Sequence, residues 1–176
     1  MKLLLHICCA PCSVACVRAL RGEGLDVSGF WYNPNIHPFT EYKARRDALA
    51  GYADSVNLPL TARDEYGLRD FLTLTWPASP EPGRCVACYQ TRMDAAAAHA
   101  AENGFEAFST TLLISPYQRH DLLCETAEET ARRHGVRFLY RDFRPLFREG
   151  QAEARELGLY RQKYCGCIFS EEERYA

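Results

Sequence analysis

The sequence lacks long apolar runs. No stretch is apolar over the roughly 18 residues that a membrane-spanning helix requires. Only three leucines follow Met1 and Lys2 before His6 interrupts the run. The sequence therefore also lacks the apolar segment and the small-residue cleavage site of a secretion signal. These absences predict a cytoplasmic protein.

Glycine-rich phosphate-binding loops are missing as well. Neither G-x-G-x-x-G nor G-x-x-x-x-G-K-[ST] occurs, and the first predicted strand leads into cysteines where a nucleotide-binding enzyme would present glycines. This counts against a nucleotide-activating enzyme. A net charge of −2 likewise excludes a protein that binds nucleic acid through overall basicity.

What is present is an ordinary globular composition with a regular alternation of elements. The 176 residues, 47% of them hydrophobic and 25% charged, predict one domain over residues 1–176. Strands alternate with helices, so we expect an α/β fold, a parallel sheet with helices on both faces. Residues 76–84 are expected to form a loop. The expected strands are 2–7, 25–32, 58–61, 105–111 and 136–140, and the expected helices are 13–21, 39–53, 85–103, 115–134 and 147–157.

Cysteine is the unusual component. An odd number of clustered cysteines, without a secretion signal, fits a reducing compartment in which clusters serve metal or redox chemistry. In parallel sheets the site forms at the carboxyl ends of the strands, and the first cluster directly follows the first strand. The sequence contains nine cysteines, at positions 8, 9, 12, 16, 85, 88, 124, 165 and 167.

Four of these cysteines form two pairs that suit a shared metal centre. Cys85 and Cys88 lie at a predicted helix start, where the helix dipole favours thiolates. With Cys8 and Cys9 they supply the four sulfurs of a 4Fe-4S cluster or a zinc site. Adjacent cysteines are unusual for zinc, so the cluster is favoured. The alternative is that the N-terminal cysteines are small core residues.

The C-terminal pair, Cys165 and Cys167, is a separate feature. A disulfide across a single glycine closes a small, strained ring that is easily reduced, which favours a redox-active pair. Two further metal ligands, or two thiols without a role, are the alternatives. Cys16 and Cys124 lie among apolar neighbours on predicted helices and are expected to pack in the core.

Three charged or titratable residues lie near the cysteines in the sequence. Arg84 and Arg92 flank the Cys85-x-x-Cys88 motif and are expected to offset the charge of thiolates, the alternative being solvated arginines. His6 is expected to be a hydrogen-bonded core histidine.

Two further groups of residues point to substrate binding. Tyr117, Gln118 and His120 follow a predicted strand, which places them near the expected site. Residues 131–163, which include Arg132 and Arg133, contain nine Lys or Arg against four acids, with aromatic residues interleaved. This pattern fits a nucleic-acid surface, and a solvated helical face is the alternative.

Five segments together resemble one protein family. These segments are LLLHICCAPCS (3–13), NPNIHPFTEYKARR (33–46), RCVACYQTR (84–92), FSTTLLISPYQRH (108–120) and LYRQKYCGCIFS (159–170). In this order they resemble the cobalamin-independent epoxyqueuosine reductases, the QueH family. The resemblance covers nearly the whole chain.

The resemblance implies a HUP-type fold and the deoxygenation of epoxyqueuosine at the wobble position of tRNA. It implies that Cys8, Cys9, Cys85 and Cys88 hold a 4Fe-4S cluster and that Cys165 and Cys167 form a redox-active pair. It further implies one additional iron ion, with Cys12 as its candidate ligand. The partners implied are tRNA and an electron donor that the sequence does not identify.

Three other functions compete with this interpretation. A zinc-stapled module that binds tRNA or protein would keep the four cysteines but would not need the C-terminal pair. A thiol–disulfide oxidoreductase would need only that pair. A nucleotide-activating enzyme would need the missing glycine-rich loop. The proton donor of a reductase stays open among Tyr117, His120, Tyr164 and a bound water.

Overall fold

The computed structural model describes residues 1–76 and 83–176, and its centre is a five-stranded parallel sheet. The strand order is β3-β2-β1-β4-β5, and every pair of neighbours is parallel. The strands are β1 (Lys2–His6), β2 (Asp26–Trp31), β3 (Leu60–Ala62), β4 (Ala107–Thr110) and β5 (Arg137–Phe138). The predicted parallel α/β architecture of the HUP-like type is confirmed.

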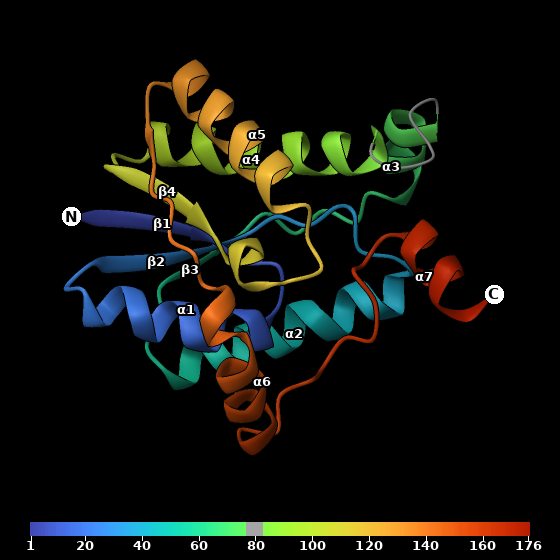
Figure 1. Ribbon diagram of the computed structural model, residues 1–176, viewed down its shortest axis with the longest axis horizontal. Helices are drawn as coiled ribbons and strands as arrows, with labels where there is room; N and C mark the ends of the chain where they lie inside the picture. Colours follow the sequence, from blue (N-terminus) through green and yellow to red (C-terminus); the bar gives the residue numbers. More distant parts are fainter. Residues whose placement is uncertain (77–82) are drawn as a thin grey trace.

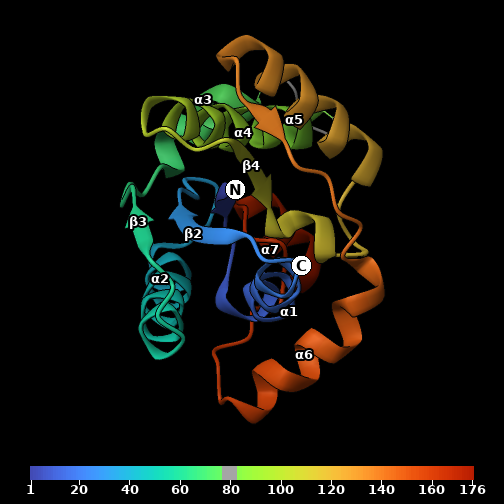
Figure 2. The ribbon, with the colours of Figure 1, turned by 90° about the vertical axis from the view of Figure 1, so that its left-hand side faces the viewer.

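The apolar run of β1 explains its central position. Leu3, Leu4 and Leu5 are completely buried, because both faces of a central parallel strand are covered by helices. The covering helices form two layers, one on each face of the sheet (Figures 1 and 2). One layer contains α1 (Ala10–Gly22), α2 (Phe39–Ser55) and α6 (Phe147–Glu156), and the other contains α3 (Leu68–Thr75), α4 (Gly83–Glu102) and α5 (His120–His134).

Most predicted boundaries agree closely with the structure, and two helix starts are wrong. Helix α1 begins at Ala10, three residues before the predicted start at 13, because Pro11 fits the first turn. Helix α5 ends at Gly135, whose φ of 64° provides the left-handed C-cap that was expected there. The predicted start of this helix at Ser115 is wrong. Residues Thr111–Ile114 form the 3₁₀ helix η2, and the Ser115 hydroxyl accepts the N–H of Tyr117 in a local turn, so α5 begins only at His120.

The structure also contains three short helices that the sequence did not predict. Helices α3 and α7 (Ile168–Tyr175) have eight residues each, and a helix this short forms mainly through tertiary packing. The 3₁₀ helix η3 (Arg144–Leu146) precedes α6. The loop predicted at 76–84 falls largely on residues 77–82, outside the described residues, and its last two residues already belong to α4.

The chain order of the strands places the functional edge. Strand β1 pairs with β2 on one side and with β4 on the other. The loop after β1 leads to α1 on one face of the sheet, and the loop after β4 leads to α5 on the other face. Such switch points are where parallel α/β proteins bind ligands. Helix α7 lies beyond this carboxyl edge (Figure 1). In the described part of the chain, no helix has the length and apolar character needed to cross a bilayer.

Candidate metal centre and thiol-lined pocket

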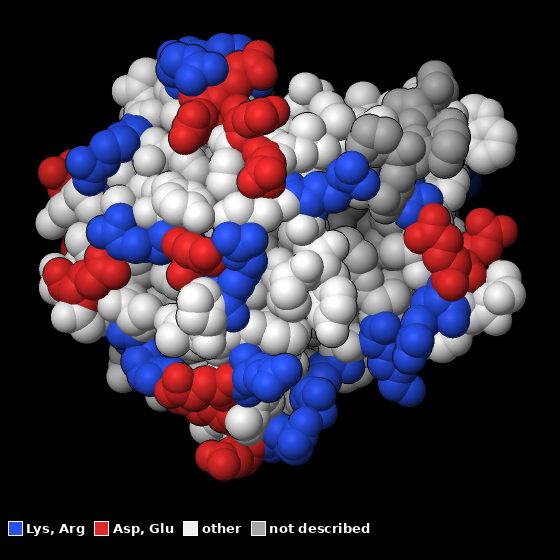
Figure 3. Space-filling view, in the orientation of Figure 1, with Lys and Arg blue, Asp and Glu red and all other residues white. Residues whose placement is uncertain are grey.

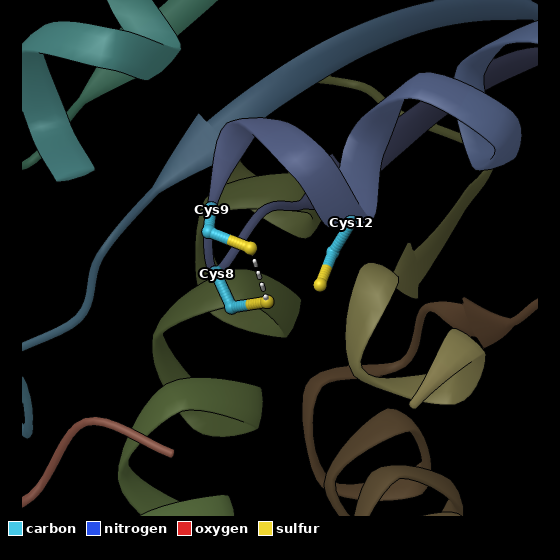
Figure 4. Close-up of side chains that lie close together, drawn as sticks. All are labelled: Cys8, Cys9 and Cys12. Atoms are coloured by element: carbon cyan, nitrogen blue, oxygen red, sulfur yellow. Dashed lines mark hydrogen bonds between the residues drawn. The ribbon is translucent and has the colours of Figure 1, made fainter. Parts of the chain in front are cut away.

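Three cysteines converge where β1 passes into α1. The strand ends at His6, and Pro11 starts the helix in its first turn, so the chain turns sharply at Cys8 and Cys9. This turn brings Cys12 of the first helical turn back onto the same side (Figure 4). The three Sγ atoms lie within 4.8 Å of one another, and those of Cys8 and Cys9 are 3.8 Å apart.

The end of β4 anchors this turn. The backbone N–H of Cys8 donates to Thr111 Oγ1 at 3.1 Å, and the Thr111 hydroxyl lies 3.4 Å from Cys8 Sγ. One position earlier, His6 Nδ1 lies 2.9 Å from Thr110 Oγ1. His6 is fully buried and its Nε2 is 3.2 Å from the carbonyl of Tyr32, so the prediction of a hydrogen-bonded core histidine is confirmed.

The three thiols titrate as a unit. Hydrogen bonding with Cys12 and with Cys9 holds the pKa of Cys8 well below its usual value, despite burial. Donation to Cys8 raises the pKa of Cys12, and burial raises the pKa of Cys9. A metal ion that displaced the thiol protons would gain three thiolate ligands.

The middle of α4 contributes a buried cation. Arg92 is 2% exposed, and its Nη2 lies 3.1 Å from Cys88 Sγ. Burial raises the pKa of Cys88 to about 11, and Arg92 opposes this rise. Although burial lowers the pKa of Arg92, the charges of Cys88, Cys165 and Cys8 raise it above its ordinary value. Arg92 thus lies beside Cys88, and its role in offsetting the charge of a thiolate-bound cluster stays a prediction.

Arg84 has a different main contact. Its guanidinium pairs with Glu173 at 2.7 Å and lies over the Phe169 ring, so it ties α4 to α7. Cys16 is fully buried as expected, and Cys124 is only half-buried.

The four cysteines predicted to share a cluster lie in two separate pairs, one at the β1–α1 turn and one in α4. Among the described residues, Cys12 joins Cys8 and Cys9 within 4.8 Å, whereas Cys85 and Cys88 lie outside that group. Cys88 packs against Cys167. The assignment of Cys85 and Cys88 as ligands stays a prediction.

The C-terminal pair extends from the surface into the protein interior. Cys165 is exposed, whereas Cys167 is buried against Cys88 and Phe71, and both thiols are free. Gly166 joins them with a φ of 148°. A Cβ at this glycine would come within 3.2 Å of Arg45 Nη1 and 3.3 Å of Ile36 Cγ1, so glycine suits both the conformation and the space.

Two residues from the beginning of α2 and the loop before it hold this pair in place. The buried Arg45 donates from Nη1 to the carbonyl of Cys165 at 2.9 Å and from Nη2 to that of Tyr164 at 3.0 Å. The backbone N–H of His37 donates to the carbonyl of Gly166 at 2.8 Å. We call Arg45 and His37 the C-terminal clamp.

The clamp makes stability depend on pH. The N–H of Ile168 donates to His37 Nδ1 at 3.1 Å, an acceptor that protonation would remove. Burial lowers the pKa of His37 from 6.5 to about 4. The folded state thus binds fewer protons than the unfolded state between these values. The stabilisation is complete above pH 6.5 and is lost as the pH falls towards 4, by up to about 3 kcal/mol.

Thermal unfolding as a function of pH tests this prediction. His6 has a similarly lowered pKa, also chiefly through burial, so wild-type protein should lose stability through both residues in this window. His37→Gln should retain only the part due to His6. An identical slope in the variant would contradict the role assigned to His37.

Gln162 is a site residue that the sequence analysis missed. Its Nε2 lies 3.0 Å from Cys9 Sγ and 3.8 Å from Cys12 Sγ. Its Oε1 is buried and has no hydrogen-bond partner among the described residues. Three convergent soft sulfur donors beside an unpartnered amide oxygen fit a bound iron centre. The only sequence signal was its closeness to the Cys165-Gly166-Cys167 motif.

A pocket of about 460 Å³ opens beside the three cysteines. Cys8 and Cys12 line it from the β1–α1 turn, and Cys165 lines it from the C-terminal segment. A larger cavity of about 710 Å³ lies between α4 and strands β2 and β3, but no cysteine lines it. The reactive side chains therefore identify the smaller pocket as the candidate site.

The residues predicted to bind substrate divide into two groups. Tyr117 and Gln118 line the pocket, and Gln118 Nε2 lies 3.4 Å from Cys165 Sγ. His120 does not line it, and its ring contacts the Tyr140 hydroxyl at 3.0 Å. Arg132 and Arg133 lie at the other end of α5, roughly 20 Å from His120 at a rise of 1.5 Å per residue.

The basic residues of 131–163 are distributed over α5, β5, η3, α6 and the segment before α7. Several of them pair with acids, including Arg133 with Asp94 and Arg141 with Glu23. Lys163 lines the thiol pocket. The structure thus brings one end of this stretch to the candidate site and leaves the other end away from it.

This parallel α/β fold, with cysteines at the switch point of its sheet, defines the chain as a HUP-like protein with a cysteine-based site. Two solved structures share the fold. A predicted tRNA methyltransferase subunit from Methanocaldococcus jannaschii has a TM-score of 0.56 at 11% identity, covering 97% of this chain and 94% of that one. The U34-tRNA thiolase NcsA from Methanococcus maripaludis, solved with its [4Fe-4S] cluster, has a TM-score of 0.59 at 14% identity, covering 98% and 63%.

Sequence relatives identify the family. Residues 3–173 match the model of epoxyqueuosine reductase QueH, and the chain belongs to this family of oxidoreductases. The epoxyqueuosine reductase QueH of Dehalococcoides mccartyi is 40% identical, over 99% of this chain and 94% of that protein. The protein of the same name from Thermotoga maritima is 34% identical, over 97% and 91%. The resemblance drawn from the five segments is confirmed.

Proposed function

We propose that this chain reduces the epoxide of epoxyqueuosine, at the wobble position of tRNA, to the alkene of queuosine. Membership of the epoxyqueuosine reductase QueH family carries the proposal. The pocket supports it, because Cys8 and Cys12 face Cys165 there and reductive chemistry needs thiol or metal groups at the substrate. We infer that the whole domain, residues 1–176, serves this one site.

The metal ligands follow from the same proposal. Cys8 and Cys9 would hold a 4Fe-4S cluster together with Cys85 and Cys88, and Cys12 would be available to one additional iron ion. When bound, these groups would supply single electrons and a Lewis acid for the epoxide oxygen. Arg92 would offset the negative charge of the thiolates, since its guanidinium already lies 3.1 Å from Cys88 Sγ.

The C-terminal pair would provide the reducing equivalents. Loss of the epoxide oxygen as water requires two electrons and two protons. Oxidation of the Cys165 and Cys167 dithiol to a disulfide releases the same number of each. Cys165 faces the pocket and Cys167 packs against Cys88, so the pair connects the substrate side with the metal side. A separate electron donor would then restore the dithiol.

The three side chains proposed from the sequence as proton donors differ in their position relative to the pocket. The Tyr164 hydroxyl donates to the carbonyl of His37 and is committed to the C-terminal clamp. His120 does not line the pocket, whereas Tyr117 does. We assign one proton to the Cys165 thiol, because it carries an exchangeable proton in the pocket itself.

Anaerobic purification and substrate conversion test the proposed function. We expect a brown protein with about four iron and four sulfide per chain, or one more iron where the second ion is bound. It should convert epoxyqueuosine in tRNA to queuosine, as measured by mass spectrometry of digested nucleosides. Cys8→Ser should lose the visible absorption and the conversion, and Cys124→Ser should keep both. A colourless zinc protein without conversion would contradict the proposal.

A further inference from the structure

Tyr117 is presented to solvent in an unusual way. Its side chain is 85% exposed, the highest value among the large hydrophobic residues that the structure describes. The ring is nonetheless supported, since it packs edge-on against Phe147 with 6.0 Å between centroids. The turn that carries it is also ordered, because its N–H donates to Ser115 Oγ at 3.2 Å. An exposed aromatic ring on a fixed support is suited to stacking against a flat ligand.

The charge around this ring has one sign. Arg45, Lys163 and Arg174 line the pocket that Tyr117 borders, and no acidic residue lines it. Lys163 and Arg174 are exposed, and no carboxylate of the described residues forms an ion pair with either. The acids of α7 lie elsewhere: Glu171 and Glu172 line a different hollow, and Glu173 pairs with Arg84.

The surface view agrees with this distribution. Figure 3 shows an uncharged area near the middle of the face, over the segment between η2 and α5, with Lys and Arg side chains on several of its sides. A local surplus of cations is notable in a chain whose net charge is −2. It provides electrostatic attraction for a polyanion at this particular place.

We propose that Tyr117, supported by Phe147, is a stacking platform for an unpaired base of the RNA substrate, and that Lys163 and Arg174 hold the phosphates beside it. The inference rests on the proposed function, which makes tRNA the substrate. An aromatic ring beside free cations is how proteins bind single strands, because every base has a face that can stack. A base inside a duplex has no free face, so the occupant is a nucleotide of the anticodon loop next to the modified one.

Binding of two RNA probes tests the platform. One probe is a synthetic anticodon stem–loop, and the other is a fully paired duplex with the same number of phosphates. Tyr117→Ala should weaken binding of the stem–loop between about fivefold and a hundredfold, the range expected for one stacked base, and leave duplex binding unchanged. Tyr117→Phe should bind both probes like wild type, because it keeps the ring.

The cations and a surface control complete the design. Lys163→Gln should weaken binding of both probes and lower the slope of affinity against salt by about one ion. Trp76→Ala removes another highly exposed aromatic side chain, 71% exposed and outside the pocket, and should change neither affinity. Equal losses on both probes for Tyr117→Ala, or no loss on either, would overturn the platform.

The outcome can be separated from that of the proposed function. Wild-type protein that converts epoxyqueuosine, with a Tyr117→Ala variant that binds the stem–loop as tightly, overturns the platform and leaves the reductase in place. Wild-type protein that binds the stem–loop through Tyr117 but converts no epoxyqueuosine when loaded with iron supports the platform and contradicts the reductase. Because Tyr117 is so exposed, its substitution should leave the melting temperature unchanged, which confirms that affinity alone has been altered.

Discussion

Serine in place of Cys165 is expected to abolish repeated turnover, with a loss of more than about 10³-fold in rate, typical of removing a group that takes part in bond making. Cys165 is the pocket-facing member of the C-terminal pair, and Cys167 is buried beside Cys88. A hydroxyl cannot form a disulfide, so the pair can no longer release two electrons and two protons together. Multiple-turnover conversion of epoxyqueuosine in tRNA, with a dithiol as reductant, measures the effect.

The metal content of the same variant distinguishes two roles for Cys165, relaying electrons to the substrate or binding the metal. Cys165 lies outside the group formed by Cys8, Cys9 and Cys12, so Cys165→Ser should retain wild-type iron and visible absorption. Cys124→Ser is a matched control, because it removes a half-buried thiol on α5 that does not line the pocket. Loss of iron in Cys165→Ser would identify this residue as a ligand and would end the relay hypothesis.

The fold could be predicted where one local pattern decides it. Three consecutive leucines identify β1 as a buried strand, and Gly135 marks the end of α5 through its positive φ. The start of α5 could not be predicted in this way. Ser115 and Pro116 satisfy the rules for a helix start, yet the Ser115 hydroxyl bonds within a local turn instead. Both conformations suit the same residues, and packing of the preceding 3₁₀ helix selects between them.

The site could be predicted where the residue type alone indicates the chemistry. Cysteines at 8, 9, 12 and 165 could be assigned to a site because thiols are rarely clustered without a role. The clamp could not, because Arg45 contacts the carbonyl of Cys165, which is 120 positions away in sequence. An arginine within a helix has no feature that foretells such a contact. Gln162 escaped notice for the same reason, since only the fold brings its amide to Cys9.

Arg45→Met is expected to destabilise the protein by about 3–5 kcal/mol, the usual cost of removing one partner from a buried charged network. The substitution fills much of the space but leaves the carbonyls of Tyr164 and Cys165 without their donors. It also leaves Glu41, now 2.7 Å from Arg45 Nε, as a mostly buried carboxylate without its ion-pair partner, although the Tyr160 hydroxyl still donates to it. A melting temperature about 10 °C lower should result for a chain of this size.

The neighbouring residue provides the control for this prediction. Arg46 lies next to Arg45 on α2, but its ion pairs with Asp47 and Asp64 are at the surface. Arg46→Met should therefore change stability by less than about 1 kcal/mol. In Arg45→Met the segment containing Cys165 should also exchange its backbone amides faster, because the clamp no longer holds it. Equal melting temperatures for the two variants would show that the buried guanidinium does not hold the C-terminal cysteine pair in place.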